Sequence, residues 1–368
     1  MSVPVFITGT GLVTAQGVGV EANWTNLLAG RVLHETGIVP LDRDPALPRV
    51  SQLAIHAARQ AHDTVGRPAL NHPRTALVIG TSKGPIEDWI DQLNGQRPPD
   101  ITLGIGRVAV DIAHALGQAY GPRLTLAGAC ASGLHALIRA SDLIRQGTCD
   151  HALVVAAEAS THALFQANFA RLGVLANPAV GCRPFDADRH GFLLAEAAAA
   201  VWLTHQPTPG CIQIEHGLAL ADSTHLTGVD QTGRTLRHLL ATLGVPRVDH
   251  VHAHGTGTVL NDAVELAAIE AALGQYHPTV YSHKHAIGHT QGAAGLISVV
   301  LDAEMHRRGT VLGNANTLRT LSARPEKDRI DIRREPGVYR LTRSVEIAAG
   351  FGGTVAGVRL ASKPVPLE

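Results

Sequence analysis

A run of small residues around one cysteine constrains the fold of this chain more than any other stretch. Residues 124–126 read LTL, which is typical of a strand, and apolar residues with helical spacing follow from Leu134 onward. The residues between them, 127–133, read AGACASG, with Cys130 at the centre. A sharp turn needs such small neighbours, because a bulky Cβ would collide with the returning backbone. The stretch therefore predicts a strand, a tight turn and a helix that starts near Cys130.

This position makes Cys130 a candidate nucleophile. The free N–H groups and the positive end of the dipole at a helix start stabilise a thiolate. The same N–H groups can hold an oxyanion on a substrate attached to the sulfur. The alternative is a buried, inert cysteine, which is the common state of a free cysteine. Cys130 alone does not decide between the two.

Three glycine-containing motifs in the second half of the chain add further reactive side chains. They read HGTGT over residues 254–258, KHAIGHT over residues 284–290 and GFGGT over residues 350–354. The apolar residues before His254 predict a strand, so this imidazole should lie at a strand end, where α/β proteins usually hold catalytic groups. Glycines beside His254 and His289 allow a ligand to approach the backbone closely.

Together with the cysteine turn, these motifs resemble those of the elongating β-ketoacyl synthases of the thiolase superfamily. The resemblance runs from ITGTG at residues 7–11 to the GFGG loop, with the motifs in the same order. It implies a thiolase fold, a five-layered α/β/α/β/α arrangement with two similar halves. We place the boundary between the halves in QPTPG. Residues 1–206 then carry the nucleophilic cysteine, and residues 207–368 carry His254, His289 and the GFGG loop, which would act as a gate.

The resemblance implies an acyltransferase that condenses two thioesters with loss of CO₂. Cys130 would carry the acyl chain, while His254 and His289 would bind the thioester carbonyl of malonyl-ACP and support decarboxylation. Both imidazoles must be neutral, because their N–H groups donate to a developing enolate oxygen. The product would be a β-ketoacyl-ACP.

The resemblance also places Lys284 in the catalytic set and assigns supporting roles to other residues of the same motifs. Lys284 would pair with Glu265, order the site and fix the histidine tautomers. Phe351 would cover the cysteine pocket as a gate, and its backbone N–H would join that of Cys130 in an oxyanion hole. The other supporting positions are Asp262, Thr256, Thr258, Gly352 and Gly353.

The chain departs from the family pattern in several places. It is short around residues 32–50 and 84–105, which in the family contribute to the dimer surface and the wall of the acyl pocket. Ala195 and Ala197 replace glycines that are usual in the family. Ala348 and Ala349 replace a polar and aromatic pair, and Val355 replaces an asparagine. These departures leave the acyl chain length and the partner subunit open. They favour a specialised polyketide or polyene pathway over primary fatty-acid synthesis.

The residues leave two other functions open. Some ketosynthase-like proteins have lost the nucleophile and act as chain-length-factor subunits in a heterodimer, but this chain keeps Cys130, so we expect an active subunit. Alternatively, His250, His252 and His254 alternate along the expected strand and can share one face, as in a zinc hydrolase. Further imidazoles follow at His283, His285 and His289. Since the ketosynthase pattern accounts for the acidic residues after His254, we expect no metal.

The composition narrows the classes of partner. Among 368 residues, 31 Lys and Arg balance 31 Asp and Glu, so no basic field attracts nucleic acid or anionic membranes. No apolar stretch approaches the ~20 residues of a membrane span, and the first residues do not resemble a signal peptide. The four cysteines lack paired spacing, which favours a reduced, cytoplasmic setting. We expect an acyl carrier protein as partner, a homodimer or a heterodimer, and no cofactor.

Overall fold

The computed structural model describes residues 3–66, 70–118, 120–224, 230–321 and 329–362. Its main sheet contains β1 (Val5–Thr14), β2 (Gly17–Val18), β3 (Thr75–Gly80), β4 (Arg123–Leu126), β5 (His151–Glu158), β6 (Ala197–Thr204), β7 (Ile212–Ala221), β8 (His250–His252), β9 (Thr279–Tyr281), β12 (Arg343–Gly350) and β13 (Thr354–Ser362). The helices are α1 (Val20–Leu28), α2 (Arg49–Thr64), α3 (Ile86–Leu93), α4 (Arg107–Leu116), α5 (Ser132–Arg145), α6 (Ala163–Arg171), α7 (Arg234–Leu243), α8 (Val259–Leu273), α9 (Lys284–Ile287) and α10 (Ala294–Arg308). A separate pair is formed by β10 (Thr310–Val311) and β11 (Gly337–Val338).

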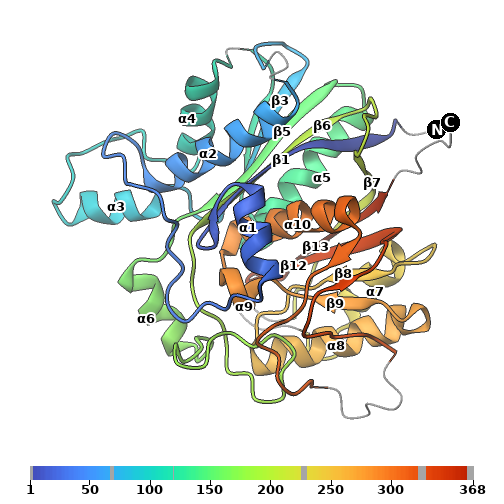
Figure 1. Cartoon of the computed structure of the whole chain (residues 1–368). Helices are drawn as coiled ribbons and strands as arrows, with labels where there is room; N and C mark the ends of the chain where they lie inside the picture. Colours follow the sequence, from blue (N-terminus) through green and yellow to red (C-terminus); the bar gives the residue numbers. More distant parts are fainter. Residues whose placement is uncertain (1–2, 67–69, 119, 225–229, 322–328, 363–368) are drawn as a thin grey trace.

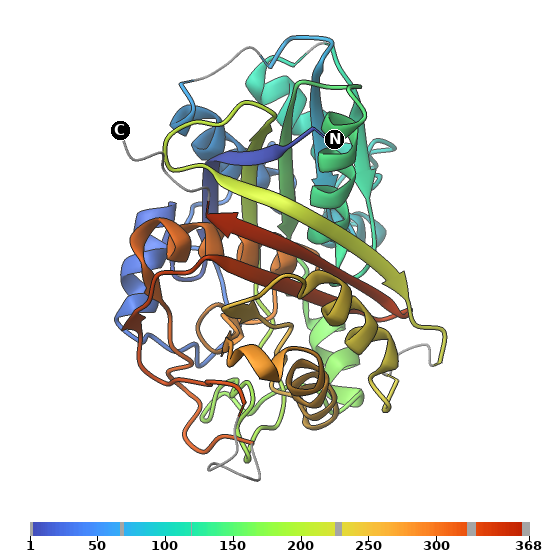
Figure 2. The same ribbon diagram turned by 90° about the vertical axis from the view of Figure 1, so that its right-hand side faces the viewer.

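The two halves of the main sheet repeat one topology. In the first half the order is β4-β3-β5-β6-β1, with three parallel strands followed by two antiparallel ones. In the second half β9-β8-β12-β13-β7 has the same order, directions and chain sequence. The halves join where β1 pairs with β7 over Val5 to Ile7 only. Figure 2 shows β7 and β13 crossing the middle of the molecule between the halves.

Helices form the other three layers (Figure 1). On the outside, α2 and α4 cover the first half of the sheet, and α7 and α8 cover the second. Between the halves lie α5 and α10, which contact each other and both sets of strands. Because α10 is covered on all sides, it is buried from Ala294 to His306. The expected five-layered thiolase fold with two similar halves is confirmed.

Two glycine residues in the first strand allow close packing of a helix. β1 runs through Gly9 and Gly11 to Thr14. A Cβ would lie 2.3 Å from the Ala61 carbonyl oxygen at Gly9 and 2.1 Å from the Ala57 carbonyl oxygen at Gly11. These glycines therefore let the backbone of α2 lie directly against β1.

Two further features complete the first half. α2 begins at Arg49 after Pro48, and the Ser51 side chain in its first turn is buried. The shortened region 84–105 contains α3. The predicted boundary after residue 206 falls in the loop between β6 and β7 and stays a prediction. Within the described ranges, no helix combines the length and the apolar character needed to cross a bilayer.

Replacing Gly11 with alanine tests the packing of α2 on β1. Because the added Cβ would collide with the Ala57 carbonyl, we expect Gly11→Ala to lower the free energy of unfolding by roughly 1–3 kcal/mol. Gly104→Ala is the control, since a Cβ at Gly104 meets nothing within 4 Å; its effect should stay within about 0.5 kcal/mol. Urea denaturation measures both, and equal losses would contradict the explanation.

Candidate active site

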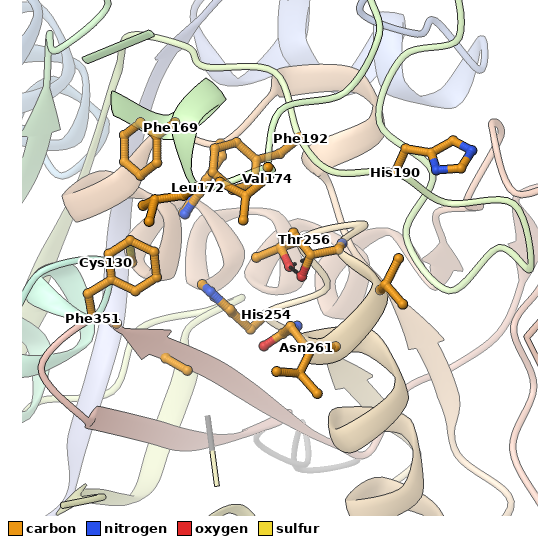
Figure 3. A pocket seen from close by; sticks show the side chains of 17 residues that line it. Cys130, Phe169, Leu172, Val174, His190, Phe192, His254, Thr256, Asn261 and Phe351 are labelled. Carbon is orange, nitrogen blue, oxygen red and sulfur yellow. Dashed lines mark hydrogen bonds between the residues drawn. The ribbon is translucent and has the colours of Figure 1, made fainter. Parts of the chain in front are cut away.

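A cavity of about 350 Å³ holds three of the four side chains predicted to be catalytic, Cys130, His254 and His289. Cys130 comes from the first half of the chain, and His254 and His289 come from the second, so the cavity lies between the halves. Figure 3 shows Cys130 and Phe351 on one side of the cavity and His190 on the opposite side. Of the other predicted site residues, Thr256, Thr258 and Phe351 line the cavity. Asp262, Glu265 and the fourth predicted catalytic residue, Lys284, are buried behind it.

The turn that carries Cys130 is tightly held. Ala129 has a φ of 47°, in the left-handed region that strains any residue with a Cβ and that recurs at functional sites. The Ser132 hydroxyl accepts from Gly128 N (2.9 Å) and donates to the Ala129 carbonyl (2.6 Å). From the other half, the Thr354 hydroxyl donates to the Gly128 carbonyl (3.0 Å). Cys130 therefore sits on a fixed turn, two residues before α5.

The protonation state of Cys130 differs from the expected thiolate. Burial raises the pKa of the thiol to about 11, while the charges of Lys83 and Lys284 lower it. Desolvation of the sulfur thus outweighs the positive groups nearby. At neutral pH the thiol is protonated, so its attack on a thioester requires a base that accepts the proton.

The two cavity histidines are neutral. Burial lowers the pKa of His254 and of His289 well below the usual range, and the charge of Lys284 acts in the same direction. Their ring centroids lie 5.5 Å apart with the planes at 81°. Gln291 N donates to His289 Nδ1 (3.4 Å), which leaves the proton of that ring on Nε2. His289 can therefore donate a hydrogen bond from Nε2 without carrying a charge.

Lys284 and Glu265 hold the backbone at His254 rather than each other. Glu265 accepts from His254 N (2.6 Å) and from Gly255 N (2.7 Å), and the Lys284 ammonium donates to the His254 carbonyl. Among the described residues they form no direct ion pair, which differs from the expected pairing. The charge of Glu265 nevertheless raises the pKa of Lys284, against the larger effect of burial, which lowers it. The pair fixes the position of His254 through its peptide groups.

The loop after His254 is fixed in a similar way. The Asp262 carboxylate accepts from Phe185 N (2.8 Å) and from Gly257 N (3.1 Å). The Thr256 and Thr258 hydroxyls lie 2.9 Å apart in the cavity wall. These hydroxyls give a largely apolar cavity a polar strip near His254.

Aromatic rings connect the cavity mouth with the catalytic histidines. Phe351, 40% exposed, packs near Phe169 with ring centroids 6.2 Å apart. Phe169 meets Phe192 edge to face at 5.6 Å, and Phe192 meets His289 edge to face at 4.7 Å. The glycines that follow Phe351, Gly352 and Gly353, both adopt left-handed φ values. An exposed aromatic ring next to two glycines, whose backbone can rotate freely, suits the predicted gate.

The sequence reasoning missed a polar group beside Cys130. The Lys83 ammonium donates to the Gln291 side-chain oxygen and to the Ser82 hydroxyl (2.9 Å). The buried Glu158 carboxylate accepts from Ser82 N (2.9 Å) and Gly292 N (3.3 Å). Lys83 follows β3 and Glu158 ends β5, which are parallel neighbours. Polar residues at the carboxyl ends of parallel strands were the signal that could have found them.

Comparisons with known proteins place these motifs in one family. The model of the beta-ketoacyl synthase N-terminal domain matches residues 37–208, and that of the C-terminal domain matches residues 214–317. A 3-oxoacyl-[acyl-carrier-protein] synthase 2 from Mycobacterium leprae is 28% identical over 402 residues, which cover 95% of this chain and 94% of the relative.

Solved structures match over almost the whole chain. A type II polyketide ketosynthase, in complex with its acyl-carrier protein and bound to the hexaketide, superposes with a TM-score of 0.86 at 22% identity and covers 99% of this chain and 100% of its own. A ketosynthase in complex with its chain length factor, from Xenorhabdus doucetiae, gives a TM-score of 0.85 at 22% identity and covers 98% of each chain. At these identities the structures support the fold.

The pH dependence of Cys130 alkylation tests the balance between burial and nearby cations. Because burial raises the pKa of the thiol to about 11, the rate with iodoacetamide should keep rising to about pH 11. Lys83→Met removes a charge that lowers this pKa, so its profile should shift to higher pH, whereas Lys83→Arg should retain the parent profile.

Mass spectrometry of the Cys130 peptide is the readout, since Cys149, Cys182 and Cys211 are also free thiols. A parent profile that levels off near neutral pH would show that the helix start and the cations outweigh burial.

Proposed function

Because the chain belongs to the β-ketoacyl synthase family, we propose that it condenses an acyl group on Cys130 with malonyl-ACP to give β-ketoacyl-ACP and CO₂. The observation that carries the proposal is the convergence of Cys130, His254 and His289 on one cavity. These side chains supply the nucleophile and the neutral donors that a decarboxylative condensation needs. The relative from Mycobacterium leprae is itself named for an acyl-carrier-protein substrate.

The first step transfers the acyl group to the enzyme. The Cys130 thiol attacks the thioester of acyl-ACP, and a neutral cavity imidazole accepts the thiol proton and passes it to the departing carrier thiol. The backbone N–H groups of Cys130 and Phe351 hold the tetrahedral oxyanion. Gly350 supports this arrangement, because its Cα approaches Cys130 N so closely that a Cβ would lie 2.9 Å from that nitrogen.

The second step removes CO₂ from the malonyl unit. His254 and His289 donate to the thioester carbonyl, and they stabilise the enolate that forms as the carboxylate leaves. Lys284 does not take part directly, because its ammonium is bound to the His254 carbonyl. The low polarity of the surrounding aromatic wall strengthens the donated hydrogen bonds. Carbon–carbon bond formation follows when the enolate attacks the acyl carbonyl on Cys130.

A second ketosynthase-like subunit is the proposed partner besides the carrier protein. The shortened region 84–105 leaves large apolar side chains in solvent, with Trp89 46% exposed and Leu93 71% exposed. Trp89 and Leu93 lie four residues apart on α3, and exposed apolar side chains that gather on one face mark protein contacts. The Xenorhabdus ketosynthase forms a complex with its chain length factor. A homodimer or such a heterodimer would cover this surface, with the present chain as the active subunit.

We infer a specialised polyketide or polyene pathway and a cytoplasmic location. Ala348 and Ala349, which differ from the family pattern just before Phe351, support a specialised pathway. The location is supported by the cysteines, which are all free. Thiols of this kind persist in a reducing compartment.

Two substitutions separate the proposed roles. In Cys130→Gln the nucleophile is lost while the amide imitates the acyl thioester carbonyl, so condensation should stop and CO₂ release from malonyl-ACP should continue. In His289→Ala the thiol remains, so Cys130 should still be acylated, while decarboxylation should fall about 10²–10³-fold with the loss of one donor.

The assay measures CO₂ release and Cys130 acylation for both variants and the parent. If the two activities fell together in both variants, the assigned division of roles would be wrong.

A further inference from the structure

A continuous set of hydrogen-bonded side chains crosses the core of the second half. At its outer end, the Ser362 hydroxyl, half-buried at the end of β13, lies 2.7 Å from His306 Nδ1. His306 Nε2 lies 3.0 Å from the Ser344 hydroxyl. That hydroxyl donates to Glu346 Oε1 (2.6 Å). These three links lead from the end of β13 through α10 to β12.

The inner part leads toward the cavity. The carboxyl groups of Glu346 and Asp302 act on each other's pKa, and one oxygen of each, Glu346 Oε2 and Asp302 Oδ2, is buried with no other hydrogen-bond partner among the described residues, so that one shared proton can join them. Asp302 Oδ1 lies 2.6 Å from His252 Nδ1, and His252 Nε2 lies 2.9 Å from His283 Nδ1. All four of these side chains are fully buried. We call the seven residues the polar chain: Ser362, His306, Ser344, Glu346, Asp302, His252 and His283.

The chemistry of the polar chain suits proton movement. Hydroxyls, imidazoles and a carboxyl pair that holds one proton can each donate and accept, so no link has a fixed direction. Burial raises the pKa of both Asp302 and Glu346, and they therefore retain a shared proton. A core of this size does not need such groups, because buried carboxyls cost more than apolar side chains of similar volume.

A metal site explains the cluster less well. His250, His252 and Asp302 place one ligand atom each within 4.8 Å of one another. Ligands on tetrahedral zinc, with bonds of about 2.0–2.1 Å, lie roughly 3.3 Å apart. The 2.6 Å between His252 Nδ1 and Asp302 Oδ1 is a hydrogen-bond distance and too short for two ligands of one ion. The predicted alternation also fails to gather three histidines, since His254 lies in the cavity instead.

The proposed condensation consumes one proton in each cycle. Acylation is neutral, because the thiol proton of Cys130 leaves on the carrier thiol. In condensation the malonyl carboxylate leaves as CO₂, the new carbon–carbon bond forms, and the bond from the acyl carbon to the Cys130 sulfur breaks. Because burial raises the pKa of the Cys130 thiol to about 11, the thiolate is a poor leaving group, and the sulfur gains a proton as it departs in this step. The malonyl-carrier arm fills the cavity mouth during this step, so a second route for the proton is useful.

We propose that the polar chain delivers this proton from the rim of β13 to the active site, an inference that rests on the proposed function. The inner end, His283, directly precedes Lys284, and its Nε2 is buried without a hydrogen-bond partner in the described parts of the chain. The charges of Lys284 and His289 both act on the pKa of His283, which burial lowers. The last transfer runs from His283 toward the His289 imidazole, which lines the cavity with Cys130.

The test compares two breaks in the polar chain with a matched control. His252→Gln keeps hydrogen-bonding atoms but removes the titratable ring, and Ser344→Ala removes a hydroxyl link farther out. His250→Gln is the control, because His250 is equally buried on β8 and bonds to the Thr279 hydroxyl (2.6 Å), while its Nε2 lies 3.7 Å from Asp302 Oδ1, beyond hydrogen-bond distance. For each protein, Cys130 is first loaded from acyl-ACP, and a single condensation with malonyl-ACP is then followed in H₂O and in D₂O.

We expect loading of Cys130 to stay within about twofold of the parent in all three variants. The single condensation should slow by about 10²-fold in His252→Gln and in Ser344→Ala, with a larger solvent isotope effect, as expected when a proton donor is lost. It should remain at the parent rate in His250→Gln. A melting temperature for each variant separates loss of folding from loss of proton delivery.

Several results would overturn the proposal. An unchanged condensation rate in folded His252→Gln and Ser344→Ala would contradict it. Equal slowing in His250→Gln would indicate that these residues have a structural role only. One equivalent of bound metal in the purified protein, lost in His252→Gln, would replace it with a metal site. A parent that is not acylated at Cys130 would refute the proposed function itself, and the proton route with it.

Discussion

The contact between the Cys130 turn and the end of the last hairpin is the interaction on which the site depends. Thr354 bonds to the Gly128 carbonyl, and Gly350 packs against the nitrogen of Cys130. The two halves of the sheet pair along a short stretch of β1 and β7 only, so this contact sets how the nucleophile of one half faces the histidines of the other. Glycine at 350 is required because a Cβ would fill the space beside Cys130.

Burial of the site has opposite consequences for its groups. Desolvation keeps the Cys130 thiol protonated and keeps His254 and His289 neutral. A protonated thiol is a poor nucleophile, but a neutral imidazole beside it can take the proton, and neutral N–H donors are what an enolate oxygen needs. The same burial therefore makes the thiol a poorer nucleophile and keeps the histidine donors uncharged. It also means that the proton which the sulfur regains must reach an interior without bulk water.

The sequence could predict what local spacing encodes and little of what tertiary packing decides. The strand, turn and helix around Cys130 follow from small residues beside a helical apolar pattern, and the motifs placed both histidines. The repeated strand order left no trace in the residues, because it depends on pairing between distant strands. Lys83 stayed hidden because its neighbour Gln291 lies 208 positions away. Spacing suggested that Lys284 and Glu265 are close, but it could not reveal that both bind the His254 peptide.

Transfer of an acyl group to the protein tests the central claim most directly. The purified chain would be incubated with a panel of acyl carrier proteins that differ in acyl chain, and its peptides analysed by mass spectrometry. The account predicts that one or more acyl groups appear on Cys130, and that Cys149, Cys182 and Cys211 stay unmodified. Absence of transfer from every carrier, or acylation at another cysteine, would contradict it and favour a non-catalytic subunit.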